Sequence, residues 1–510
     1  MSRPNFVFIM TDTQATNVIG AYGDMNHRKG MDLHTPNIDR LADTGIKFER
    51  AYTTCPLCTP ARAGIFTGIY AHTAGAWTNN LPLGDNIITM GQRFQDAGYH
   101  TGYIGKWHLD GHDYFGTGLC PDGWDPDVWF DGKRYLDELT ETEITLWRRG
   151  LNSLEDLREH DIQAEFTWAH RISDRAERFL SGHDDRPFVL VVSYDEPHHP
   201  FTCPPEYVEM FEDFDYPLGP AAFDALEGKP AHQQEWATSA NVGPPNAEGT
   251  VRLPMYLGAN SFVDFEIGRV IDAVHRYAPE NTWIIYTSDH GDMMGAHRLT
   301  GKGPVMYEEI AHIPLIVEPP PGSAYDGAAR EPVASTVSHI DLLPTMMELA
   351  GMEVPPILEG ESLSPLLMGD EQPSRSAVIE FQRYEIEHDS WGGFQPVRAI
   401  TQGRYKLVIN LLHTDELYDM HADPGEVVNR IADPELAEIR DELHDRLLTW
   451  MYAKRDPFRG PVWERRPWRE SRRLTWRGEF RPRPADGYAP EVRDYDTGLP
   501  TEGVKTEYGK

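Results

Sequence analysis

The 510-residue sequence predicts an α/β fold, in which helices sandwich a mainly parallel sheet and a smaller α+β subdomain follows at the C-terminal end. Three observations support this prediction. Short β-branched and aromatic runs alternate with longer amphipathic segments, as in parallel sheets covered by helices. After Pro373 the pattern changes to closely spaced strands. A hydrophobic content of 40% is enough for a large core.

The first part of the chain, residues 1–373, is expected to form the larger, α/β domain. Its apolar runs predict strands at residues 5–10, 188–193, 283–287 and 313–318, and its amphipathic segments predict helices at 38–44 and 164–180. Residues 204–254 are rich in Pro, Gly, Asn and acidic side chains, which indicates a long surface excursion. We expect this excursion to frame a substrate entrance.

The rest of the chain divides into a subdomain and an arm. Strands are predicted at 377–382, 397–401 and 405–410, followed by a helix at 434–453, and together they form an α+β subdomain of residues 374–455. Residues 456–510 form an arm, and the stretch 455–483 holds ten arginines and three tryptophans. Such a stretch can bind single-stranded nucleic acid, but docking on the acidic body of this or a neighbouring subunit fits the charge better. The arm therefore predicts a homo-oligomer.

The overall charge limits the partners of the protein. With 47 basic and 81 acidic side chains the net charge is −34, which argues against nucleic acid and anionic lipid surfaces. The apolar runs are far shorter than the roughly 20 residues of a membrane span, and the first residues do not read as a signal peptide. Four cysteines do not make a disulfide framework. We therefore expect a cytoplasmic protein in which any site for an anion carries its own positive charge or a metal.

Polar side chains follow three of the predicted strands. Asp12 follows the first strand, His198 follows the run that ends in V-V-S-Y-D-E-P, and Asp289 and His290 follow W-I-I-Y-T-S. An acidic residue in such a place often caps a helix or forms a turn. However, ligand sites of parallel sheets lie at the carboxyl ends of the strands, so the three ends are expected to share one crevice. Carboxylate oxygens with an imidazole suit Mn²⁺, Mg²⁺ or Ca²⁺.

The sequence also contains a C-x-x-C pair, formed by Cys55 and Cys58. Such a pair is typical of a redox dithiol or of half a zinc site. Neither interpretation finds support elsewhere, because there is no second C-x-x-C and Cys120 and Cys203 are scattered. Cys58 is therefore expected to have another role.

The stretch C-T-P-A-R from Cys58 to Arg62, followed by A-G-I-F-T-G, resembles the signature of the sulfatase family. Further motifs match that family in order over residues 4–320: M-T-D-T-Q, G-K-W-H, P-H-H-P-F, S-D-H-G, and G-A-H-R-L-T-G-K-G. In this family the signature cysteine is oxidised to formylglycine, whose hydrated aldehyde is the nucleophile. The resemblance therefore makes Cys58 the precursor of the nucleophile.

The resemblance implies an alkaline-phosphatase-like fold and a set of site residues. It implies one divalent metal ion (Ca²⁺, Mn²⁺ or Mg²⁺) held by Asp12, Asp289, His290 and the modified Cys58. It also implies that Arg62 and Lys106 steady the nucleophile, that Lys302 and His198 contact the sulfate and protonate the leaving oxygen, and that His108 assists the release of sulfate. Asn79 and His297 lie near matched motifs, and we expect structural hydrogen bonds there.

Two positions depart from the family's pattern. Many sulfatases have two adjacent acids in the first motif, whereas Asp12 is followed here by Thr13 and Gln14, so a further ligand from that motif stays open. Ala61 stands where many relatives have Ser, and related phosphonate monoester hydrolases vary there too.

The resemblance implies an arylsulfatase-type hydrolase that acts on small-molecule sulfate esters and needs a formylglycine-generating or equivalent maturing enzyme. One alternative is a phosphonate monoester hydrolase or phosphodiesterase on the same scaffold, although the motif G-K-W-H favours sulfate. A second alternative is a non-catalytic oligomeric protein that binds anions in the crevice.

Overall fold

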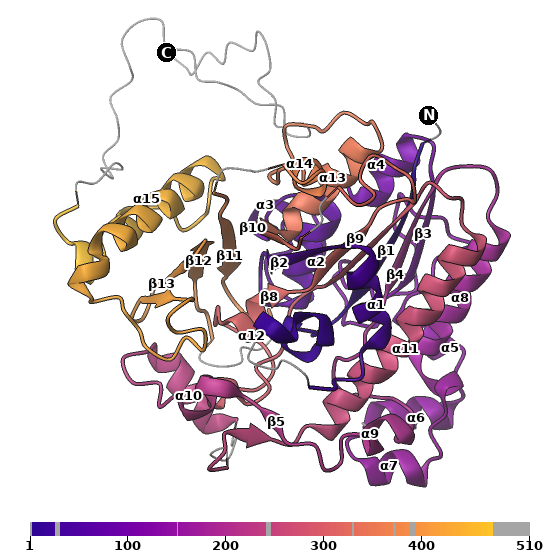
Figure 1. The fold of residues 1–510 in the computed structure, drawn as a ribbon, viewed down its shortest axis with the longest axis horizontal. Coiled ribbons are helices and arrows are strands. Elements are labelled where there is room, and N and C mark those ends of the chain that lie inside the picture. The colour runs from indigo at the N-terminus through magenta and orange to yellow at the C-terminus, as the bar shows by residue number, and fades with distance from the viewer. Residues whose placement is uncertain are drawn as a thin grey trace, which may run out of the picture.

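A central sheet of eight strands organises the fold (Figure 1). The computed structural model describes residues 3–25, 31–149, 151–240, 246–328, 331–370, 374–386 and 393–472. The strand order is β10-β2-β9-β7-β1-β4-β3, and β8 also pairs with β2. The strands are β1 (Asn5–Thr11), β2 (Ile46–Tyr52), β3 (His100–Gly105), β4 (Phe188–Ser193), β7 (Thr282–Ser288), β8 (His312–Ile313), β9 (Leu315–Glu318) and β10 (Val333–Ser338). Because only β8 and β9 pair antiparallel among these strands, the prediction of a mainly parallel sheet is confirmed.

Helices cover both faces of this sheet, and side chains of β1 alternate between the two layers. Phe6 and Phe8 pack on the face covered by α2, α4 and α13, whereas Val7 and Ile9 pack on the face covered by α1, α8 and α11. These helices are α1 (Pro36–Thr44), α2 (Cys58–Thr67), α4 (Met90–Asp96), α8 (Trp168–Gly182), α11 (Pro254–Tyr277) and α13 (Leu342–Leu349). A strand buried on both sides reads as a continuous apolar run, as β1 does in the sequence.

Shorter helices lie at the ends of the layers and in the connections. They are α3 (Ala71–Ala74), α5 (Gly132–Asp137), α6 (Glu141–Arg149), α7 (Leu154–Glu159), α9 (Pro205–Glu209), α10 (Ala231–Ser239), α12 (Glu308–Ala311) and α14 (Ser364–Leu367). The predicted excursion thus contains α9, α10 and a small hairpin of β5 (Tyr216–Pro217) and β6 (Thr250–Val251). Among the described residues, no helix combines the length and the apolar character that crossing a bilayer requires.

The helix predicted at 164–180 differs at its start. Residues Ala164–Phe166 form a short 3₁₀ turn, and α8 begins after Thr167, whose side chain accepts a hydrogen bond from the backbone N–H of His170. A threonine that satisfies a free N–H in this way fixes where a helix begins.

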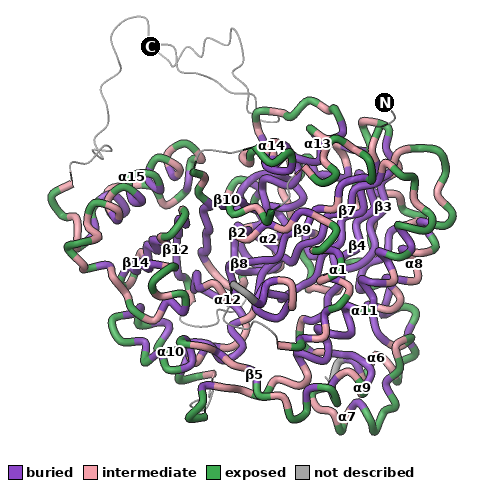
Figure 2. Tube along the Cα trace, viewed as in Figure 1, coloured by how far each residue is buried: buried purple, intermediate pink, exposed green. Residues whose placement is uncertain are grey.

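The C-terminal subdomain is a four-stranded antiparallel sheet with a long helix. The strands β11 (Ala377–Phe381), β12 (Val397–Gln402), β13 (Tyr405–Asn410) and β14 (Glu416–Asp419) follow in order, and α15 (Ala437–Ala453) comes after them. Leu407 and Ile409 pack under α15, whereas Ile379 and Val408 pack on the catalytic domain. Both faces of this sheet are therefore covered, as Figure 2 shows by burial.

The described part of the arm packs on this subdomain. After α16 (Pro461–Glu464), the guanidinium of Arg466 bonds the carboxylate of Asp415 at 2.7 and 2.9 Å, and Trp468 Nε1 donates to the same carboxylate. Trp463 is buried in the core below α15. The remainder of the predicted arm, residues 473–510, lies outside the described residues.

Candidate active site

The site lies where three neighbouring strands of the central sheet end. β1 pairs with β4 on one side and with β7 on the other, with Thr11 opposite Ser288. Asp12 therefore lies beside Asp289, and the residues after β4 reach the same edge. The structure brings these three strand ends together, as their places in the sequence suggested.

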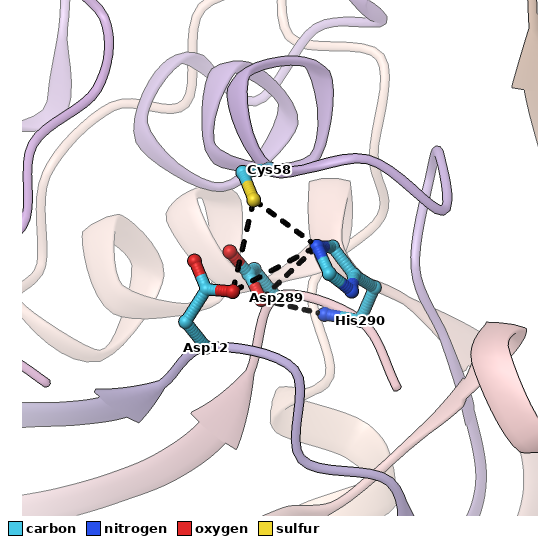
Figure 3. A group of neighbouring side chains, drawn as sticks. All are labelled: Asp12, Cys58, Asp289 and His290. Carbon is cyan, nitrogen blue, oxygen red and sulfur yellow. Dashed lines mark hydrogen bonds and ion pairs between the residues drawn. The ribbon is translucent and has the colours of Figure 1, made fainter. Parts of the chain in front are cut away.

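Asp12, Cys58, Asp289 and His290 form a compact buried group (Figure 3). Each offers one potential ligand atom, and the four atoms lie within 4.8 Å of one another. Cys58 Sγ is 3.3 Å from His290 Nε2 and 3.7 Å from Asp12 Oδ1. His290 Nδ1 lies 2.9 Å from the carbonyl oxygen of Gly291, which directs the lone pair of Nε2 into the group.

Cys58 is the first residue of α2, a helix whose ten residues are all buried. The backbone N–H of Thr59 donates to Asn79 Oδ1 at 3.1 Å, so Asn79 makes the structural hydrogen bond expected of it. A buried helix N-terminus next to the sulfur favours negative charge at that place.

Arg62 and Lys106 form ion pairs with the carboxylates of the group. Arg62 Nε is 3.0 Å from Asp289 Oδ2, and its Nη2 is 3.2 Å from Asp12 Oδ2. Lys106 Nζ lies 2.7 Å from Asp12 Oδ2 and 2.8 Å from Asp195 Oδ1. Both cations are therefore paired with carboxylates and hold them in place. Asp195 is absent from the sequence-based set, although its position three residues before His198 could have indicated it.

Lys302 contacts the sulfur of Cys58, and the charges of Lys302 and Lys106 act on His198. Lys302 Nζ is 2.6 Å from Cys58 Sγ and 3.9 Å from Asp12 Oδ1. The ring of His198, a partly exposed residue, lies tilted against Tyr114 with 5.7 Å between ring centroids. The pKa of His198 is lowered by burial and by Lys302 and Lys106. Neither Lys302 nor His198 has a carboxylate within hydrogen-bond distance among the described residues, so both can meet an anion.

The pKa values of the two acids in the group shift in opposite directions. Burial opposes ionisation of Asp12, but Lys106 and Lys302 outweigh it and hold its pKa well below the usual range. Burial and the neighbouring Asp12 instead raise the pKa of Asp289 to about 7. Burial, with Asp12, also raises the pKa of the Cys58 thiol to about 12. At neutral pH the unmodified sulfur is therefore a thiol and not a nucleophilic thiolate.

The side chains of Thr13 and Gln14, in the second half of the first motif, make hydrogen bonds of their own. Gln14 Oε1 accepts hydrogen bonds from Thr11 and Tyr286, and its Nε2 donates to Asn260 at 2.5 Å, so this side chain is occupied away from the sulfur. Thr13 Oγ1 donates to Asp12 Oδ1. Asp12 is thus the one acidic member of this motif in the group.

The two remaining candidate histidines, His108 and His297, have different hydrogen-bond partners. His108 is buried, and its Nε2 lies 3.0 Å from Asn80 Oδ1. His297 Nδ1 pairs with Asp224 at 2.6 Å and its ring stacks on Tyr307, a structural arrangement of the kind expected there. The four cysteines are free.

The residues present fit a divalent cation. Two carboxylates and an imidazole with a directed lone pair are a donor set for Ca²⁺, Mn²⁺ or Mg²⁺, and a neutral His290 is available because burial lowers its pKa. An oxygen in place of Sγ would make residue 58 a donor of the same hard character.

Comparison with known proteins identifies the family to which the chain is similar. The sulfatase family model matches residues 4–352, and the model of the N-sulphoglucosamine sulphohydrolase C-terminal region matches residues 295–453. The uncharacterized sulfatase YidJ of Escherichia coli is 57% identical over 100% of this chain and 99% of its own. An N-acetylglucosamine-6-O-sulfatase of Bacteroides thetaiotaomicron is 28% identical over 86% of this chain and 85% of its own.

A solved structure shares the fold. The phosphonate monoester hydrolase of Silicibacter pomeroyi superposes with a TM-score of 0.70 at 22% identity, covering 89% of this chain and 96% of its own. The resemblance seen in the sequence motifs is confirmed by the sulfatase family model, which matches residues 4–352. The chain belongs to the sulfatase family of the alkaline phosphatase superfamily and is a sulfuric ester hydrolase.

Proposed function

We propose that this enzyme hydrolyses sulfate monoesters in the manner of an arylsulfatase, with an aldehyde made from Cys58 and one divalent metal ion. The observation that carries the proposal is the placing of Cys58 at a helix N-terminus, within one group with Asp12, Asp289 and His290. Lys302 beside the sulfur adds the positive charge that a sulfate would meet.

The state of Cys58 supports oxidation to formylglycine by a maturing enzyme. A thiol with a pKa of about 12 is a poor nucleophile at neutral pH, so Cys58 in its unmodified form does not suit the reaction. The hydrated aldehyde would supply a hydroxyl group as the nucleophile at the same place.

Asp12, Asp289 and His290, together with residue 58, would hold the metal ion. When bound, a Ca²⁺, Mn²⁺ or Mg²⁺ ion polarises a sulfate oxygen and lowers the pKa of a coordinated hydroxyl. Arg62 and Lys106 keep the two carboxylates oriented through their ion pairs.

The remaining residues handle the sulfate and the protons. Lys302 Nζ binds a sulfate oxygen and offsets the charge that develops on the transferred group. The partly exposed His198 would donate a proton to the leaving alcohol oxygen together with Lys302, once a bound sulfate raises the pKa that burial and the lysines lower. His108 accepts a proton when sulfate is released.

Mass spectrometry of the peptide that contains Cys58 tests the nucleophile. Conversion of Cys to formylglycine lowers the mass by about 18 Da, as the atomic composition requires. We expect this loss together with turnover of an aryl sulfate, and we expect Cys58→Ala to abolish turnover. Turnover that persists in Cys58→Ala would overturn the proposal.

Phosphonate monoester or phosphodiester hydrolysis is the second candidate function. The observation in its favour is that Asp12 is the one acid of the first motif in the metal group, because Thr13 and Gln14 follow it. Rates on an aryl sulfate, a phosphonate monoester and a phosphodiester separate the two functions, and a strong preference for the phosphonate would reverse our choice.

The alcohol of the substrate needs its own screen. A relative named as an N-acetylglucosamine-6-O-sulfatase covers 86% of this chain, which makes sulfated amino sugars the natural set to compare with aryl sulfates. We expect a higher kcat/KM on one of these two sets, and competition between them measures the preference directly.

A further inference from the structure

Two consecutive asparagines connect the nucleophile helix with its surroundings. Asn79 Oδ1 accepts from Thr59, and the Asn79 backbone N–H donates to the carbonyl oxygen of Tyr384 at 3.2 Å. Asn80 Oδ1 lies 3.0 Å from His108 Nε2. This short segment thus contacts the start of α2, the C-terminal subdomain and the imidazole of His108.

The imidazole of His108 lies among the charged groups of the site. Burial, with Lys106 and Arg62, lowers its pKa well below the usual range, so the ring is neutral at pH 7. A neutral imidazole carries one N–H, on either Nδ1 or Nε2. Which nitrogen keeps its lone pair then decides where the ring can accept a proton.

The partner of Nε2 settles this question in the structure. Asn80 Oδ1 is an acceptor only, so the nitrogen that faces it must carry the hydrogen. The other nitrogen, Nδ1, is buried and has no hydrogen-bond partner among the described residues. The lone pair of a neutral His108 is therefore on Nδ1, which no described residue engages.

The backbone adds to the same arrangement. Asn80 and His108 have φ values of 61° and 58°, in the left-handed region that residues with a Cβ seldom adopt. The carbonyl oxygen of His108 accepts a hydrogen bond from Thr59 Oγ1 at 3.0 Å, next to Cys58. Two unusual conformations are thus held so that Asn80 and the ring of His108 meet.

We infer that Asn80 is a positioning residue, which holds His108 in the Nε2–H tautomer so that Nδ1 accepts the proton when sulfate is released. This inference rests on the proposed function. His108 Nδ1 takes the proton of the free hydroxyl at residue 58, and the electron pair of that O–H bond forms the C=O bond. The C–O bond to the sulfate group breaks, and sulfate leaves with its electron pair.

The first test reads the tautomer and needs neither the aldehyde nor the metal. In ¹⁵N-histidine-labelled protein, a two-bond ¹H–¹⁵N correlation distinguishes protonated from unprotonated ring nitrogens, and His108→Gln assigns the signals. We expect an unprotonated Nδ1 and a protonated Nε2 in the wild type and in Asn80→Asp, which keeps the acceptor. Asn80→Ala should lose this bias, whereas the exposed Asn246→Ala should keep it. A protonated Nδ1 in the wild type, or an unchanged tautomer in Asn80→Ala, overturns the inference.

The second test separates the two halves of the reaction in the matured enzyme. Asn80→Ala should keep the first-turnover burst of alcohol but lower the steady-state kcat about 10²-fold, the lower end for loss of a proton acceptor. In Asn80→Asp a carboxylate beside the ring should raise the pKa of His108 and move the acidic limb of the kcat profile to higher pH.

The outcomes distinguish this inference from the proposed function. If the wild type lacks the aldehyde or does not turn over sulfate esters, the proposed function fails, and the tautomer experiment still stands. If the wild type is active and Asn80→Ala has an unchanged burst, kcat and pH profile, the inference alone fails.

Discussion

Lys302 Nζ lies 2.6 Å from Cys58 Sγ. The two residues come from segments 244 positions apart, and the contact is buried. Arg62 and Lys106 already neutralise carboxylates, whereas Lys302 has its nearest carboxylate oxygen, on Asp12, at 3.9 Å. Lys302 is thus the cation of this site that is available to an incoming anion.

Lys302→Ala should therefore remove catalysis more than folding. We expect kcat on an aryl sulfate to fall by about 10²- to 10⁴-fold, because charge stabilisation and proton donation at the leaving oxygen are both weakened. Lys302→Arg, which keeps the charge in another geometry, should retain part of the activity. Steady-state kinetics on matured protein measures both, and wild-type kcat in Lys302→Ala would contradict the role.

Removal of the metal should lower stability. A ligand that binds the folded state alone stabilises it, by about 2.7 kcal/mol at a free concentration of 100 times its Kd. We expect EDTA to lower the melting temperature of the wild type, and His290→Gln to lack this response. His198→Gln is the matched control, because His198 lies near the site but outside the ligand group. A metal response that survives in His290→Gln would argue against this ligand.

The buried pair of His72 and Glu380 should make stability depend on pH. His72 Nδ1 lies 2.6 Å from Glu380 Oε2. Burial lowers the pKa of His72, but Glu380 outweighs this effect and raises that pKa to about 9. Because the unfolded value is about 6.5, this contribution is fully present below pH 6.5 and is lost as the pH rises through about 9. It amounts to roughly 3 kcal/mol.

Urea unfolding at several pH values measures this effect. The difference in unfolding free energy between the wild type and His72→Gln should be largest at pH 6 and should shrink toward pH 10. His275, which is half-exposed and pairs with Glu318, offers a matched control. The difference in unfolding free energy between the wild type and His275→Gln should vary much less with pH. A constant difference for His72→Gln across this range would disprove the linkage.

The ion pair between Arg466 and Asp415 should anchor the described part of the arm. Arg466→Ala leaves the buried Asp415 carboxylate without its cation, so we expect a loss of roughly 3 kcal/mol in the stability of the C-terminal subdomain. Deletion of residues 473–510 spares this contact and serves as its control. Light scattering on the same deletion variant tests the predicted homo-oligomer, and an unchanged mass would remove the arm from that role.

The sequence predicted those parts of the fold that bury continuous apolar runs. β1, β4 and β7 are such runs, and their observed bounds agree with the prediction within two residues. β2 and β3 escaped prediction because the first mixes Lys47, Glu49 and Arg50 with apolar residues and the second contains two glycines. Their strand character comes from pairing within the sheet, which a local pattern does not reveal.

The sequence motifs also indicated which residues of the site meet, but not how. Asp12, Cys58, Asp289 and His290 were expected together, and the structure places them in one group. The pairing of Arg62 and Lys106 with carboxylates was not predictable, because it depends on the register of β1 with β7 and on Asp195. Asn80 was missed as well, since a single asparagine in a loop carries no periodic or spacing signal.

The complete burial of α2 limits when Cys58 can be modified. Cys58 is 1% exposed, and every residue of its helix is enclosed between the sheet and its neighbours. Once the sheet and its covering helices have formed, a modifying enzyme cannot reach the segment around this thiol. If Cys58 is oxidised as we propose, the oxidation has to precede folding, and synthesis, modification and folding then have a fixed order in time.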